Sequence, residues 1–257
     1  MIWGGDTGTV DCQFVSYRFF GYSLTNIAFL FRETFVDLDY YFESKTTTPY
    51  IIDCGSNIGA SILFFKTLYP NATIVAFEPA VRSFEALERN VRQNGLQNIT
   101  LHRAAIGETV GTVDFYESPI VGGLTASTSK ARGGEGKTTV EQVQLSAYID
   151  RRVDLLKVDI EGSEAGLLAD LVNSERLVLV EQMIIEYHHH IQPLDDRLSA
   201  FLRTLEDAGF GYDIRASLHP SERIGAFQDL WIHAYRREAF PEKVSELHHA
   251  SGSLGPR

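Results

Sequence analysis

The sequence predicts an α/β fold built on a doubly wound, mostly parallel sheet. From residue 49 onward, short apolar runs of strand length alternate with stretches whose apolar residues recur at helical spacing, which is typical of such a sheet. The stretch IIDCGSNIGASILFF at 51–65 indicates a strand, a tight turn and a helix in direct succession. A chain of 257 residues with 44% hydrophobic and 22% charged residues suits one large globular domain.

The spacing of apolar residues predicts the helices and strands, and proline, asparagine and glycine residues predict where the helices end. The strand that ends at Ile52 leads into a helix that Pro70 stops. A second helix ends at the Asn94-Gly95 pair, and a third ends at Gly209. Further strands are expected within residues 73–79, 99–107, 112–118, 153–164, 177–188, 210–216 and 228–237, the last two as an antiparallel hairpin with a long connection.

We expect three segments along the chain. Residues 1–48 form a cover segment of strand and helix that packs on the core, 49–240 form the main domain, and 241–257 form a flexible tail. Inside the main domain, residues 118–139 are rich in Gly, Ser and Thr and lack apolar periodicity. They therefore predict a long loop or flap. The aromatic residues at 17–22 of the cover segment are expected mainly to pack in the core.

Charge and cysteine content narrow the function classes. The formal net charge of −11 argues against a basic surface that binds a phosphate backbone, so no nucleic-acid partner is expected. No apolar run approaches the length of about 20 residues that a membrane span needs, and no signal peptide is apparent. Cys12 and Cys54 are not expected to form a disulfide, which suits a reducing cytoplasm.

Acidic turns follow strand ends that meet at one edge of the sheet, where ligands bind in this class of fold. They carry Asp53, Glu78, and the pair Asp159 and Glu161. The first turn has the pattern D-x-G-x-N-x-G, which differs from the G-x-G-x-x-G spacing of a dinucleotide site. An acid at the strand end would also repel a pyrophosphate. A dinucleotide oxidoreductase is therefore disfavoured.

S-adenosylmethionine fits these acidic turns, because it carries a sulfonium and an ammonium group and no phosphate. Its amino-acid end would lie against Gly55, with Asp53 contributing negative charge. Glu78 would accept hydrogen bonds from both ribose hydroxyls, because a carboxylate offers only acceptors. The plainer alternative is that Asp53 and Glu78 cap the helices that follow. Two acids on consecutive strand ends that flank a glycine turn favour the cofactor.

A family resemblance is carried by FLFRETFVDLDYYF, IIDCGSNIGASILFFKTLYPNATIVAFEP, ALERNVRQNGLQNITLHRAAIG, and VDLLKVDIEGSE followed by IIEYH. In order and spacing, these stretches resemble the FkbM-type methyltransferases over residues 28–235. The resemblance implies a Rossmann-like class I methyltransferase fold with a seven-stranded sheet and a reversed last strand. It also implies S-adenosylmethionine-dependent O-methylation, with S-adenosylhomocysteine as product. The implied acceptor is a hydroxyl of a small natural product or sugar in secondary metabolism, such as a polyketide, a glycoside or a surface glycan.

The resemblance further implies which residues face the site, and the chemistry of methyl transfer indicates which of them act on the proton. Asp159 is the first candidate for the base that takes the hydroxyl proton, and Glu161 would orient it. His188 is the alternative base, since its unperturbed pKa is better matched. Helix capping is the plainer interpretation of Asp159 and Glu161. The expected cofactor contacts are Glu33, Asp53, Gly55, Ser56, Asn57, Gly59, Glu78, Pro79, Ala104, Ala105 and Asp159.

Other functions are possible for a chain with these motifs. A non-catalytic cofactor-binding or scaffold protein would keep the same fold. A divalent cation on Asp159, Glu161 and a histidine would make a catechol-type O-methyltransferase, although no metal site is expected. A nucleic-acid methyltransferase is disfavoured, because its Asn/Asp-Pro-Pro-aromatic turn is missing. The loop at 118–139 would shape the pocket for a small hydroxylated acceptor, and a homo-oligomer remains open.

Overall fold

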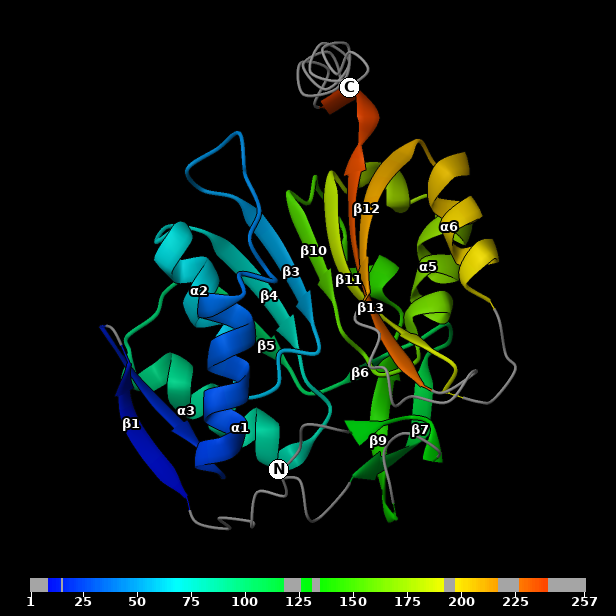
Figure 1. Cartoon of the computed structure of the whole chain (residues 1–257). Helices are drawn as coiled ribbons and strands as arrows, with labels where there is room; N and C mark the ends of the chain where they lie inside the picture. Colours follow the sequence, from blue (N-terminus) through cyan, green and yellow to red (C-terminus); the bar gives the residue numbers. More distant parts are fainter. Residues whose placement is uncertain are drawn as a thin grey trace, which may run out of the picture.

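A computed structural model describes residues 9–14, 16–117, 126–130, 135–191, 197–216 and 227–239. A seven-stranded sheet lies at its centre, with the strand order β12-β13-β11-β10-β3-β4-β5 (Figure 1). Neighbours from β11 to β5 pair in parallel, whereas β13 runs antiparallel to both β11 and β12. The sheet is therefore mixed, with the last strand reversed. Its strands are β3 (Tyr50–Cys54), β4 (Thr73–Phe77), β5 (Ile99–His102), β10 (Leu155–Val158), β11 (Gln182–His189), β12 (Phe210–Ala216) and β13 (Gln228–Arg236).

Helices cover both faces of this sheet (Figure 1). On one face lie α2 (Ala60–Leu68) and α3 (Val81–Gln93), and on the other lie α5 (Glu164–Asn173) and α6 (Leu198–Asp207). Side chains alternate across a strand. Ile51 therefore packs under α2 and α3, and its neighbour Ile52 packs under α5 and α6. Short 3₁₀ turns occur at Leu145–Tyr148, Leu177–Leu179 and Arg237–Ala239.

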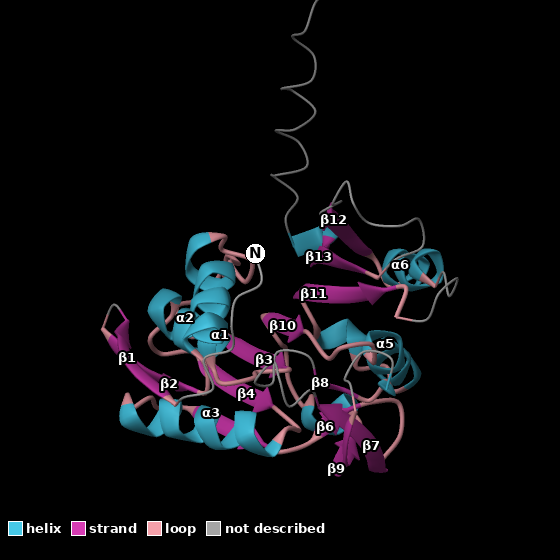
Figure 2. Cartoon of the chain, turned by 60° about the horizontal axis from the view of Figure 1, so that its bottom comes forward, coloured by secondary structure: helices cyan, strands magenta, loops and turns pink. Residues whose placement is uncertain are grey.

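The N-terminal segment packs on the helices of one face. It forms a hairpin of β1 (Val10–Phe14) and β2 (Tyr17–Gly21), and then α1 (Leu24–Phe31), which continues into a π-helical turn at Arg32–Val36. The hairpin lies beside α3 (Figure 2). Asn90 of α3 fixes it there, because its side chain accepts from the Phe20 amide and donates to the Phe20 carbonyl. Phe19 and Phe20 are buried, so aromatic residues of this segment do contribute to the core.

A second sheet of four strands follows β5 in the chain. It contains β6 (Ala105–Ile106), β7 (Gly111–Glu117), β8 (Ala126–Ser127) and β9 (Gly136–Val143), in the order β6-β9-β7-β8. The prediction of one strand over 99–107 was therefore wrong. The chain leaves the central sheet after His102, and β6 pairs with β9.

The predicted loop at 118–139 was also wrong in part, because β8 and the start of β9 lie inside it. Most side chains of β9 are exposed, so the strand carries no apolar alternation in the sequence. Residues 118–125 and 131–134 lie outside the described part of the chain.

Other expectations concern the termini, the cysteines and the membrane. The predicted tail at 241–257 lies outside the described residues. Cys12 and Cys54 are both free, as expected. Among the helices that the structure describes, none is both long and apolar enough to cross a membrane.

Candidate functional site

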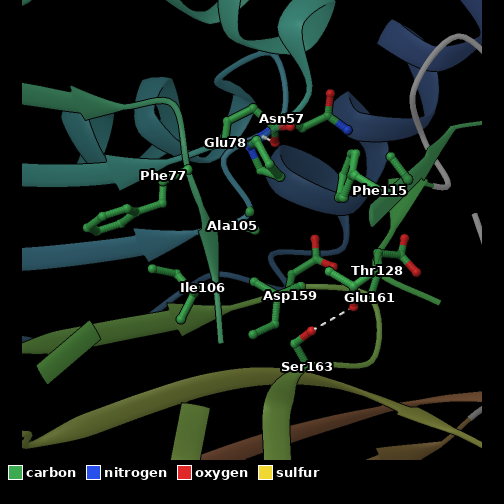
Figure 3. A pocket seen from close by; sticks show the side chains of 15 residues that line it. Asn57, Phe77, Glu78, Ala105, Ile106, Phe115, Thr128, Asp159, Glu161 and Ser163 are labelled. Carbon is green, nitrogen blue, oxygen red and sulfur yellow. Dashed lines mark hydrogen bonds between the residues drawn. The ribbon is translucent and has the colours of Figure 1, made fainter. Parts of the chain in front are cut away.

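A pocket opens where β3, β4 and β10 end, and the second sheet closes its side (Figure 3). It encloses about 590 Å³ of empty space, part of it open to solvent. The lining residues are Gly55, Asn57, Phe77, Glu78, Pro79, Ala104, Ala105, Ile106, Phe115, Ala126, Thr128, Asp159, Ile160, Glu161 and Ser163.

The glycine turn, residues 55–59, joins β3 to α2 beside this pocket. Gly55 and Gly59 adopt φ values of +85° and +93°, a region that favours glycine. A Cβ atom at Gly55 would lie 1.7 Å from the carbonyl oxygen of Asp159, so no larger residue fits there. The Asp159 amide in turn donates to the Cys54 carbonyl. Gly55 thus allows the ends of β3 and β10 to lie in direct contact at the pocket.

Glu78 follows β4 and connects the glycine turn to the start of α3. Its Oε2 accepts from the Asn57 amide and its Oε1 from the Ala80 amide, each at 2.8 Å. Burial raises the pKa of Glu78 to about 7, although these two backbone hydrogen bonds lower it. A carboxylate oxygen can accept more than one hydrogen bond. Glu78 therefore holds the backbone on both sides of the pocket and keeps acceptor capacity toward the pocket that it lines.

Lys157 is a buried cation behind the pocket, and it was not predicted. Its Nζ lies 2.6 Å from the Gly55 carbonyl oxygen, 3.3 Å from Asp159 Oδ2 and 3.5 Å from Asp53 Oδ1. Burial lowers the pKa of Lys157, but the charges of Asp159 and Asp53 outweigh it and raise this pKa above its usual value. The available signal was a lysine inside the apolar run LLKV, since a buried charge needs buried partners.

Asp53 faces the protein interior. Its carboxylate is fully buried, and Oδ2 accepts from the Ser61 hydroxyl at 2.6 Å. Ser56 is buried as well and donates its hydroxyl to the Asp53 carbonyl. Asp53 and Ser56 thus support the glycine turn from behind.

His188 is buried among carboxylates. Its Nδ1 lies 2.8 Å from Glu164 Oε1, and its Nε2 lies 3.1 Å from Glu161 Oε2. Burial disfavours charge on the imidazole, but Glu164 and Glu161 outweigh it and hold the pKa of His188 well above its usual value. Both ring nitrogens thus lie against carboxylates of the protein, and His188 is not among the described residues that line the pocket. This environment weighs against His188 as the base.

Two further carboxyl groups face Asp159 from other elements. Burial, followed by the charge of Asp159, raises the pKa of Glu33 in the π-helical turn to about 8. The same two causes raise the pKa of Glu186 in β11 well above its usual value. Glu186 was not predicted, although it stands two residues before His188 and therefore shares its face of the strand. Carboxyl groups therefore cluster at this end of the site, and burial and mutual repulsion disfavour the charged forms of Glu33 and Glu186.

The pocket brings together most of the predicted residues. Within the described chain, those that line it are Gly55, Asn57, Glu78, Pro79, Ala104, Ala105, Asp159 and Glu161. Five predicted residues are not among its lining: Glu33, Asp53, Ser56, Gly59 and His188. Phe115, Ala126 and Thr128, which the sequence did not single out, reach the pocket from the second sheet. The Ser127 hydroxyl attaches that sheet to the site by donating to the Glu161 carbonyl at 2.5 Å.

Comparisons with known proteins agree on one family. A family model described as the methyltransferase FkbM domain matches residues 53–212. Methyltransferase sdnD of Sordaria araneosa is 28% identical, over 78% of this chain and 88% of the relative. The 31-O-demethyl-FK506 methyltransferase FkbM of Streptomyces tacrolimicus is 26% identical, over 71% of this chain and 81% of the relative.

A solved structure matches the fold. The methyltransferase FkbM from Methylobacillus flagellatus KT is 19% identical with a TM-score of 0.53, over 79% of this chain. The match covers 47% of that protein, so this chain spans about half of its length. At this identity, the similarity extends to the fold alone.

Proposed function

The chain belongs to the FkbM methyltransferase family, and from this premise we propose that it is an S-adenosylmethionine-dependent O-methyltransferase. The acceptor in this proposal is a hydroxyl of a small natural product or sugar. The family itself agrees with the resemblance that the sequence motifs carry. The cofactor, the oxygen target and the acceptor class are the parts that we propose.

The arrangement of Glu78 and the glycine turn in one pocket carries the proposal. Glu78 would accept hydrogen bonds from both ribose hydroxyls, and Ala104 and Ala105 would lie beside the adenine. Gly55 and Asp159 would hold the methionine end, where the cofactor carries positive charge. The described residues that line the pocket include neither lysine nor arginine, which a pyrophosphate would favour. The donor and acceptor groups therefore suit a cationic nucleoside better than a dinucleotide.

The bound cofactor would supply an electrophilic methyl group on sulfur. An acceptor oxygen would displace sulfur from this methyl group, and Gly55, Glu78 and Asp159 would hold the cofactor for that displacement. The main contribution of the pocket would be to hold the reacting atoms in line at short distance. Asp159 would take the hydroxyl proton, since its carboxylate lines the pocket and Lys157 holds it in place.

The side of the pocket formed by the second sheet suits an acceptor with apolar parts. Phe115, Ile106 and Ala126 line this side. Its residues Ala126 and Thr128 lie within the segment that the sequence predicted to shape the acceptor pocket. The Streptomyces tacrolimicus relative is a 31-O-demethyl-FK506 methyltransferase. We propose a comparable acceptor class here, without naming the compound.

Calorimetric titration of the full chain with S-adenosylmethionine, S-adenosylhomocysteine and NAD tests the proposal. We expect both adenosyl ligands to bind with micromolar affinity and NAD not to bind. The Glu85→Gln variant, which changes an exposed residue of α3, serves as the control and should bind as the wild type does. Binding of NAD alone, or of none of the three ligands, would overturn the proposed cofactor.

A further inference from the structure

Nε2 of His188 faces carboxylates from several elements. Besides Glu161, the nearest oxygens of Asp229, Asp159 and Glu186 lie 3.8, 3.9 and 4.0 Å away. The His188 side chain is fully buried, yet Nε2 has no hydrogen-bond partner of acceptable geometry among the described residues. Buried polar atoms are nearly always satisfied in folded proteins. A group that binds both this nitrogen and the surrounding oxygens would satisfy it.

Glu164 fixes the His188 ring from the opposite side. It accepts from Nδ1 at 2.8 Å and from the Gly162 amide at 2.8 Å, and it is itself buried. A histidine that binds a metal usually donates its other ring N–H to a carboxylate in this way, which orients the ring and leaves Nε2 toward the ion. The contact between Glu164 and His188 is therefore the kind of hydrogen bond that orients a metal-binding histidine.

The spacing of three donor atoms fits one ion. One ligand atom from each of Asp159, Glu186 and His188 lies within 4.8 Å of the other two. Two donors that each lie about 2.1 Å from an ion are at most about 4.2 Å apart, so a movement of about half an ångström completes the site. One imidazole with two carboxylates suits Mn²⁺, Fe²⁺ or Zn²⁺ better than Mg²⁺ or Ca²⁺, which favour oxygen ligands.

We propose that Asp159, Glu186 and His188 bind a divalent transition-metal ion at the edge of the pocket. Because Asp159 also lines the pocket, the ion lies within reach of an acceptor hydroxyl and lowers the pKa of that hydroxyl. Asp159 is then a ligand of the ion, and Glu161, which also lines the pocket, is the carboxylate left to take the proton. The role of the ion rests on the proposed function, but its binding does not.

Titration of the chelator-treated full chain with Mn²⁺ tests this site without any cofactor or acceptor. Free Mn²⁺ is followed by electron paramagnetic resonance, and heat by calorimetry. We expect one Mn²⁺ per chain and weaker binding of Mg²⁺. Glu186→Gln and Asp159→Asn should each weaken Mn²⁺ binding at least about tenfold, and Glu164→Gln about 10- to 100-fold. Glu85→Gln should leave it unchanged.

Circular dichroism of each variant separates loss of the ion from loss of the fold. A wild type that binds no Mn²⁺ would overturn the proposal, and so would folded Glu186→Gln and Asp159→Asn variants that bind it as tightly as the wild type. Titration of the same preparations with S-adenosylmethionine keeps the two proposals apart. Cofactor binding without Mn²⁺ binding refutes the metal site alone, and Mn²⁺ binding without cofactor binding refutes the proposed function alone.

Discussion

Replacement of Lys157 by methionine tests whether buried ion pairs hold the pocket together. The two side chains have similar length, but methionine carries neither a charge nor a hydrogen-bond donor. The variant leaves the fully buried carboxylate of Asp53 without its cation. It also removes the donor that lies 2.6 Å from the Gly55 carbonyl in the glycine turn.

The size of the effect follows from the burial of the pair. Lys157 is 2% exposed and Asp53 is 0% exposed, and removal of one partner from such a pair costs about 3–5 kcal/mol. For a chain of this length, that loss lowers the melting temperature by about 6–10 °C. The pKa of Lys157 is raised above 10.5, so its stabilisation is fully present below that pH and is lost only as the pH rises further. Measurement at pH 7 therefore captures the whole effect.

Thermal unfolding followed by circular dichroism measures this loss. Lys137→Met is the matched control, because Lys137 forms an exposed pair with Asp114 at 2.8 Å and such pairs contribute little. A second variant that combines Lys157→Met with Asp53→Asn should recover part of the loss, since asparagine needs no cation. A melting temperature of Lys157→Met equal to that of the wild type would refute the reasoning.

Three further predictions concern carboxyl groups of the site. Glu78→Ala should weaken S-adenosylmethionine binding at least about 100-fold, because two charge-assisted hydrogen bonds to the ribose are lost. Unchanged affinity in calorimetry would show that Glu78 does not contact the ribose. Asp159→Asn should weaken cofactor binding only slightly, because asparagine keeps an acceptor oxygen at the methionine end. It should lower turnover about 10²- to 10⁴-fold, and full activity would dismiss Asp159 as base and as ligand. The pKa of Glu33 is about 8 when folded and 4.5 otherwise, so the folded chain binds more protons between these values. Its contribution to stability is therefore full below pH 4.5 and falls as the pH rises toward 8. Urea unfolding should show this fall, Glu33→Gln should flatten it, and an equal slope in both proteins would contradict the assignment.

The sequence could predict the parts of the site that depend on short stretches of chain. The glycine turn and Glu78 each follow directly after a strand, so the ends of parallel strands bring them together. The residue types also indicate what each residue can do, since glycine permits close backbone contact and a carboxylate accepts hydrogen bonds. These residues line the pocket of the folded chain.

Contacts between distant parts of the chain were harder to predict. Lys157 contacts the Gly55 carbonyl although the two residues are 102 positions apart in the sequence. No pattern in the sequence around either residue predicts that contact. The raised pKa of His188 depends on Glu164, which lies at the start of α5. Strand β9 escaped prediction because its exposed side chains follow no apolar pattern. Asp53 was expected to face the ligand, whereas its fully buried side chain contacts Ser61 and Lys157.

A crystal structure of the full chain with S-adenosylhomocysteine tests the central claim most directly. The account predicts the nucleoside in the pocket at the ends of β3, β4 and β10, with both ribose hydroxyls donating to Glu78 and the adenine beside Ala104 and Ala105. A nucleoside bound elsewhere, or a ribose that makes no contact with Glu78, would contradict it.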